Sequence, residues 1–77
     1  MPETLCQIAV QIQHRTGTPA DQITPETLLE DLFACGLDMT GLQCAIDETF
    51  EIYLPGETWR TWRTVADIIT TVEQTHA

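Results

Sequence analysis

The chain has 77 residues, enough for one domain around a single small hydrophobic core. Twelve Asp and Glu residues against three Lys and Arg residues give a formal net charge of −9, which disfavours nucleic acid and anionic membrane surfaces as partners and favours basic protein surfaces. No apolar run approaches the roughly 20 residues of a membrane span. Cys6, Cys35 and Cys44 lack the spacing of a metal site and cannot all pair with one another. We therefore expect residues 1–77 to form one monomeric cytoplasmic domain with reduced thiols and no metal.

The first half of the chain predicts one helix followed by a long connection. Residues 3–15 carry apolar side chains at helical spacing, and Gly17 is suited to end the helix. Residues 16–36 are rich in Thr, Pro, Gly and Asp, and Thr24-Pro25 is suited to start a short helical turn. We expect four apolar side chains, Ile23, Leu28, Leu29 and Leu32, to anchor this connection to the core.

The second half predicts a helix over residues 37–50, a short helical turn at 58–62 and a last helix opening at Thr64. The first of these has an apolar stripe formed by Leu42, Ala45, Ile46 and Phe50. Acidic residues fall on or near its opposite side, namely Asp38, Asp47, Glu48 and Glu51. Thr64 and Asp67 resemble a capping box with Asp in place of Glu. The fold class is therefore all-α, with four helical pieces around one core.

The segment from Ile23 to Val72 resembles the acyl carrier protein family without a gap. The resemblance is carried by Thr24-Pro25-Glu26-Thr27-Leu28-Leu29-Glu30-Asp31-Leu32, Leu37-Asp38, Ala45-Ile46-Asp47-Glu48-x-Phe50-Glu51-Ile52, Pro55 and Thr64-Val65-x-Asp67. It implies a four-helix acyl-carrier-type bundle with a long loop between helices 1 and 2 and a short third helix. Helix 1 is then expected to run roughly antiparallel to helix 2.

The same resemblance places the prosthetic-group site at the start of the helix over residues 37–50. The family has Gly-x-Asp-Ser-Leu here, and the Ser holds a 4'-phosphopantetheine arm. In this chain the Asp-Ser pair is Cys35-Gly36, followed by Leu37 and Asp38. These four residues are the cofactor-binding positions that the resemblance implies. Because glycine has no hydroxyl, we predict that the usual modification does not occur.

Other attachment residues remain open alternatives. A shifted register, with Gly36-Leu37-Asp38 as the residues before the anchor, would put Met39 at the anchor, and Met39 also lacks a hydroxyl. Cys35 and Thr40 are the nearest nucleophile and hydroxyl, so either is a candidate for an unusual attachment. The simpler interpretation treats Cys35 as a small loop residue and Thr40 as a solvent-facing or helix-start residue.

The acidic residues are the predicted partner-docking surface. By resemblance, Asp38, Asp47, Glu48 and Glu51 meet Arg and Lys patches on synthase, ketosynthase, acyltransferase or transferase-type proteins. A solvated acidic face that keeps the protein soluble is the alternative. Gly41 stands where the family usually has Glu, which weakens the predicted patch.

The predicted function is that of an acyl carrier protein-like protein of fatty-acid, polyketide or peptide biosynthesis. An acidic helical adaptor with no prosthetic group is the rival hypothesis. We expect no enzymatic activity, because the spacing shows no phosphate-binding glycine loop, no metal cluster and no nucleophile beside a base. Trp59, Arg60, Trp62 and Arg63 form either a binding hot spot or, as we favour, one Trp covering the core with an Arg stacked over the other.

Overall fold

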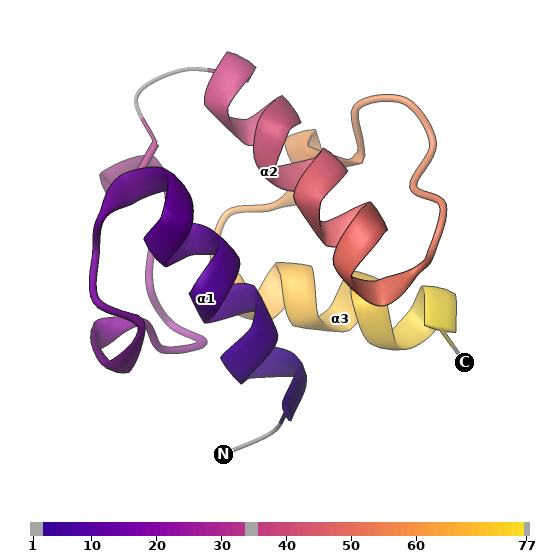
Figure 1. The fold of residues 1–77 in the computed structure, drawn as a ribbon. Helices are drawn as coiled ribbons and strands as arrows, with labels where there is room; N and C mark the ends of the chain where they lie inside the picture. The colour runs from indigo at the N-terminus through magenta and orange to yellow at the C-terminus, as the bar shows by residue number, and fades with distance from the viewer. Residues whose placement is uncertain (1–2, 34–35, 77) are drawn as a thin grey trace.

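The computed structural model describes residues 3–33 and 36–76 of the chain (Figure 1). It contains three α-helices, α1 (Glu3–Thr16), α2 (Gly36–Phe50) and α3 (Val65–His76), and three 3₁₀ turns, η1 (Ala20–Gln22), η2 (Leu29–Asp31) and η3 (Thr58–Thr61). The described residues contain no β-strand, and the all-α prediction is confirmed. The four-helix count is not confirmed, because the segment expected to be a short third helix is the single 3₁₀ turn η3.

Helix α1 ends where the sequence predicts. The backbone N–H of Gly17 donates to the Gln13 carbonyl at 2.8 Å, and Gly17 has a φ of +78°, a conformation that glycine adopts without strain. The predicted apolar stripe is buried and consists of Leu5, Ile8, Ala9 and Ile12. In Figure 1 α1 and α2 run in roughly opposite directions, as expected, and α3 runs across the view below α2.

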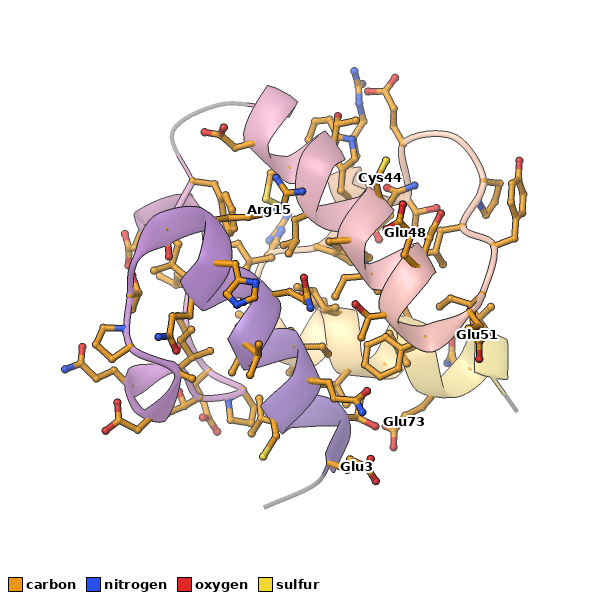
Figure 2. All side chains as sticks on the ribbon, viewed as in Figure 1. Glu3, Arg15, Cys44, Glu48, Glu51 and Glu73 are labelled. Atoms are coloured by element: carbon orange, nitrogen blue, oxygen red, sulfur yellow. The ribbon has the colours of Figure 1, made fainter. Side chains whose placement is uncertain are left out.

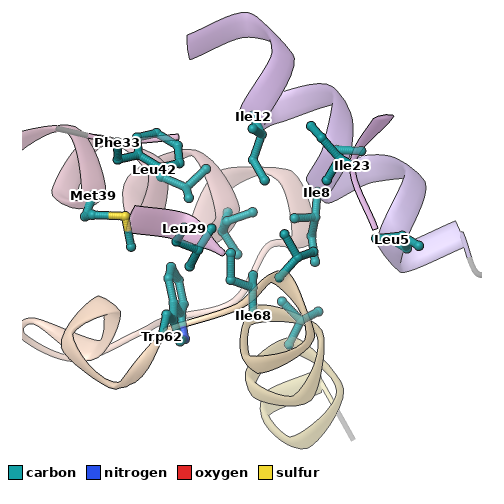
Figure 3. Close-up of a cluster of buried hydrophobic side chains, with 14 of the residues drawn as sticks. Leu5, Ile8, Ile12, Ile23, Leu29, Phe33, Met39, Leu42, Trp62 and Ile68 are labelled. Atoms are coloured by element: carbon teal, nitrogen blue, oxygen red, sulfur yellow. The ribbon is translucent and has the colours of Figure 1, made fainter. Parts of the chain in front are cut away.

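The three helices enclose one core. Ile12 of α1, Leu42 of α2 and Ile68 of α3 have no solvent exposure, and Figure 3 shows them pointing into the same interior. The connection between α1 and α2 adds Ile23 and Leu29, which are 1% and 2% exposed. Since so small a domain has few apolar groups to bury, these two loop side chains are a substantial part of its hydrophobic stabilisation.

The long connection between α1 and α2 is held by backbone hydrogen bonds to the start of α3. The N–H of Leu29 donates to the Arg63 carbonyl at 2.9 Å, and the N–H of Ala66 donates to the Pro25 carbonyl at 2.8 Å. Leu28 and Thr64 form an isolated antiparallel bridge between these two bonds. This pairing leaves Leu28 43% exposed, so the prediction that Leu28 anchors the connection to the core is wrong.

The part of the predicted capping box that Asp67 supplies at the start of α3 is confirmed. The Asp67 carboxylate accepts hydrogen bonds from the backbone N–H of Arg63 at 2.8 Å and of Thr64 at 3.1 Å. These two bonds hold the pKa of Asp67 below its usual range, because they stabilise the ionised form. Asp67 therefore satisfies two backbone donors at the beginning of the helix.

The two tryptophans have separate roles, as the favoured interpretation predicts. Trp62 is 5% exposed and lies in the core, where its indole N–H donates to the Thr71 hydroxyl at 3.0 Å. The guanidinium of Arg60 lies 5.6 Å from the ring centre of Trp59 and also pairs with Glu57 at 2.7 Å. Trp62 thus covers the core, and Trp59 lies beneath Arg60.

Candidate functional site: the start and outer face of helix α2

The position that the family resemblance implies for prosthetic-group attachment is the first residue of α2. That residue is Gly36, and Asp38 follows it in the first turn with an exposed side chain. Glycine has no side-chain hydroxyl or thiol that could bond to phosphorus. The residue present therefore does not fit a 4'-phosphopantetheine arm attached in the usual way.

The other attachment candidates differ in their accessibility. Cys35 lies outside the described residues. Thr40 is exposed on α2, about one turn beyond Gly36. Met39 is 8% exposed and belongs to the core cluster, so the shifted register would place the anchor on a buried side chain. Because an anchor must be reached by a transferase, the burial of Met39 favours the register without gaps.

Three of the four predicted docking acids are exposed. Asp38 and Glu48 lie on α2, and Glu51 follows its last residue with a φ of +53°. Glu48 and Glu51 lie along the C-terminal half of α2 and its exit in Figure 2. The side chains of Asp38, Glu48 and Glu51 are thus exposed to solvent, whereas Asp47 is not fully exposed.

Asp47 is half-buried, contrary to its expected place on the exposed acidic side. Its Oδ1 is inaccessible to solvent and has no hydrogen-bond partner among the described residues. Burial raises the pKa of the Asp47 carboxyl; the Leu54 amide opposes this shift, and the negative charge of Glu48 adds to it. The segment after α2 folds back beside the helix, where the Leu54 carbonyl accepts a hydrogen bond from the Gln43 side chain at 3.3 Å and the Leu54 amide meets the Asp47 carboxyl. This return of the chain covers the side chain and could not be inferred from helical spacing.

An arginine from α1 lies against α2 at Gly41. A Cβ built on Gly41 would be 2.5 Å from Nη1 and 3.1 Å from Cζ of Arg15, so the guanidinium occupies the space that a larger residue would fill. Arg15 is exposed and reaches toward α2 from the last turn of α1 (Figure 2). Sequence reasoning missed Arg15. The available signal was Gly41 itself, because glycine inside a helix is unfavourable unless a close approach requires it.

The same region contains a cavity of about 510 Å³ between the two helices and the connection. Arg15 and Asp38 both line it, together with the ring of the buried Phe33. Opposite charges from α1 and α2 therefore share one concave part of the surface.

Gln43 holds the segment after α2 against the helix. The side chain is 5% exposed, and its Nε2 donates to the carbonyls of Gly56 at 2.9 Å and Leu54 at 3.3 Å. Its Oε1 accepts from the backbone N–H of Trp59 at 2.8 Å. A buried polar side chain with these three bonds fixes the position of the loop that follows α2.

A second cavity, of about 550 Å³, lies where the ends of the three helices meet. Glu3, Glu51 and Glu73 line it (Figure 2).

Among the described residues no group of His, Cys, Asp and Glu side chains has an arrangement that could hold a metal ion. Over the same residues, no helix combines the length and apolar character needed to cross a bilayer.

Comparisons with known proteins identify the family. No family model matches the chain. The chain is 38% identical over 58 residues to an acyl carrier protein of Syntrophobacter fumaroxidans, covering 74% of this chain and 72% of that protein. It is 33% identical over 64 residues to an acyl carrier protein of Akkermansia muciniphila (82% and 80% covered) and 29% identical over 72 residues to one of Helicobacter hepaticus (92% and 95% covered). These similarities show that the chain belongs to the acyl carrier protein family, whose members are non-enzymatic carriers, and they confirm both the predicted family and the prediction that the chain is not an enzyme.

Proposed function

We propose that the chain is a variant acyl carrier protein of fatty-acid, polyketide or peptide biosynthesis that ordinary phosphopantetheinyl transferases do not modify. The observation that carries the proposal is Gly36, which opens α2 and which the family resemblance aligns with the attachment Ser. In the family, 4'-phosphopantetheine supplies the thiol that holds an acyl group, and Gly36 has no atom to bear it. Residues 1–77 then act as one carrier-type domain that presents its surface without the usual arm.

The remaining role of such a protein is recognition. Asp38, Glu48 and Glu51 keep three negative charges at the exposed face and exit of α2, and basic enzyme surfaces are attracted to this charge. We propose that this face docks on synthase-type enzymes that recognise carrier proteins. The half-buried Asp47 contributes less, because a partner reaches its carboxylate only in part.

Modification is tested by intact mass. The purified chain is incubated with a broad-specificity phosphopantetheinyl transferase and coenzyme A, and we expect its mass to stay unchanged. The double variant Cys35→Asp, Gly36→Ser restores the family motif and is the positive control, which we expect to gain one phosphopantetheine group. A gain of the same group by the unaltered chain would overturn the proposal, and peptide mapping with the Cys35→Ala and Thr40→Ala variants would then locate the site.

Docking is tested separately, by binding to a purified ketosynthase that recognises acyl carrier proteins. Glu48→Lys reverses a charge on the exposed face of α2 and is expected to weaken binding about tenfold or more, because like charges then face each other. Glu26→Lys makes the same exchange at an exposed turn of the α1–α2 connection and serves as the matched control. Equal binding by both variants and the unaltered chain would refute docking through α2. Stable binding only to regulatory or structural proteins would instead support the adaptor hypothesis.

A further inference from the structure

The exposed face of α2 that contains Asp38, Gly41 and Glu48 has one positive charge beside its negative charges. Arg15 of α1 brings its guanidinium to Gly41, which lies between Asp38 and Glu48 in the sequence of α2. On a regular helix these three positions fall within about 80° of one another around the axis. Gly41 is about 4.5 Å along the axis from Asp38 and about 10.5 Å from Glu48. A partner approaching this face therefore meets charges in the order negative, positive, negative.

The positive charge of Arg15 is available for an intermolecular pair. Arg60 is already paired with Glu57 at 2.7 Å, whereas Arg15 forms no ion pair with a carboxylate of the described residues. The Arg15 side chain is exposed, so a partner can reach the guanidinium without rearrangement of the core.

The lack of a side chain at Gly41 leaves the space that the Arg15 guanidinium occupies beside α2. Any side chain at position 41 would begin with a Cβ only 2.5 Å from Nη1 of Arg15, so the guanidinium would have to move away. Because Arg15 is long and exposed, this movement costs little folding energy but changes the charge presented beside α2. The effect of residue 41 is therefore expected on recognition rather than on stability.

We propose that Arg15 selects the docking partner: the enzyme surface that fits this face carries a carboxylate opposite Arg15, between basic groups opposite Asp38 and Glu48. This inference rests on the proposed docking through α2 and adds which enzyme surfaces are accepted. Binding to an enzyme with an uninterrupted Arg and Lys patch is disfavoured, because one cation of that patch then faces the guanidinium of Arg15. Arg15 is thus a specificity-determining residue in a surface that is otherwise acidic.

The test uses one ketosynthase in two forms, the native enzyme with a basic carrier-docking patch and a variant with the central basic residue of that patch replaced by Glu. Binding constants are measured by calorimetry at low salt. We expect the unaltered chain to bind the Glu-bearing ketosynthase about fivefold more tightly than the native form, and Arg15→Glu to reverse this preference. Arg63→Ala removes an exposed arginine from the segment before α3 and is expected to leave the ratio of the two constants unchanged.

A second variant changes the same site from the other helix. Gly41→Glu places a carboxylate beside Arg15 and is expected to abolish the preference while circular dichroism shows an intact fold. The inference is overturned if the unaltered chain shows no preference, or if neither Arg15→Glu nor Gly41→Glu alters the ratio while Glu48→Lys still weakens binding. If no form binds, or if Glu48→Lys also has no effect, the proposed docking function fails and this inference fails with it.

Discussion

Gln43→Leu removes the buried side chain that ties the segment after α2 to the helix. The Trp59 N–H and the Leu54 carbonyl then lose their Gln43 partners, whereas the carbonyl of the exposed Gly56 regains water. A buried group left unsatisfied costs about 1–3 kcal/mol. The additional apolar contact of Leu offsets about 1 kcal/mol. Taking about 1 kcal/mol for the amide of the half-buried Trp59 and about 2 kcal/mol for the carbonyl of the buried Leu54, less this offset, we expect the free energy of unfolding to fall by about 2 kcal/mol.

A loss of this size is large for so small a domain. Folded domains have about 0.05–0.15 kcal/mol of stability per residue, which corresponds to about 4–12 kcal/mol here. The same change lowers the melting temperature by about 10 °C. Urea unfolding followed by circular dichroism gives the free energy, and tryptophan fluorescence reports on the loop that contains Trp59.

Gln7→Leu is the matched control, because Gln7 makes one 3.3 Å bond to Glu3 on the exposed side of α1. We expect its stability to stay within about 0.5 kcal/mol of the unaltered chain. The reasoning is refuted if Gln43→Leu and Gln7→Leu have the same free energy of unfolding, whether both remain stable or both lose stability, because burial of the glutamine would then not matter.

Three further changes test two helix ends and one hydrogen bond of the core. Asp67→Ala should cost about 1 kcal/mol at pH 7. Because the pKa of Asp67 is lowered in the fold, its contribution to the free energy of unfolding is fully present above the unfolded-state pKa near 4 and is lost as pH falls through the lower folded-state pKa. Urea titrations from pH 7 downward should therefore show the stabilities of the unaltered chain and of Asp67→Ala converging. Thr71→Val leaves the indole N–H of Trp62 without its partner and should cost about 1 kcal/mol by thermal unfolding, whereas no loss would mean that this bond adds nothing. Gly17→Ala forces alanine into a φ of +78° and should lower the urea midpoint by the equivalent of about 1 kcal/mol, a loss that an unchanged midpoint would contradict.

The features that could be predicted from the sequence are those set by neighbouring residues. The buried stripe of α1 follows from helical spacing, and the Asp67 carboxylate accepts a hydrogen bond from the Thr64 amide only three residues away. Both depend on contacts within one or two turns of helix. Local patterns are sufficient for such contacts.

The features that could not be predicted depend on segments distant in sequence. Leu28 is exposed because its backbone pairs with Thr64, and Asp47 is half-buried because the chain after α2 returns to the helix. Arg15 meets Gly41 only when α1 packs beside α2. The candidate site is therefore harder to derive than the fold, since its charges come from more than one element.

The backbone pairing between the α1–α2 connection and the start of α3 sets an order on folding during synthesis. The Pro25 carbonyl and the Leu29 amide find their partners only after Ala66 and Arg63 have left the ribosome. Contacts of such long sequence separation form late, because a large loop must first be closed. The α1–α2 connection therefore cannot complete its backbone hydrogen bonds until the start of α3 has emerged from the ribosome. A release assay with ribosome-bound chains truncated before α3 should find that connection open to proteases.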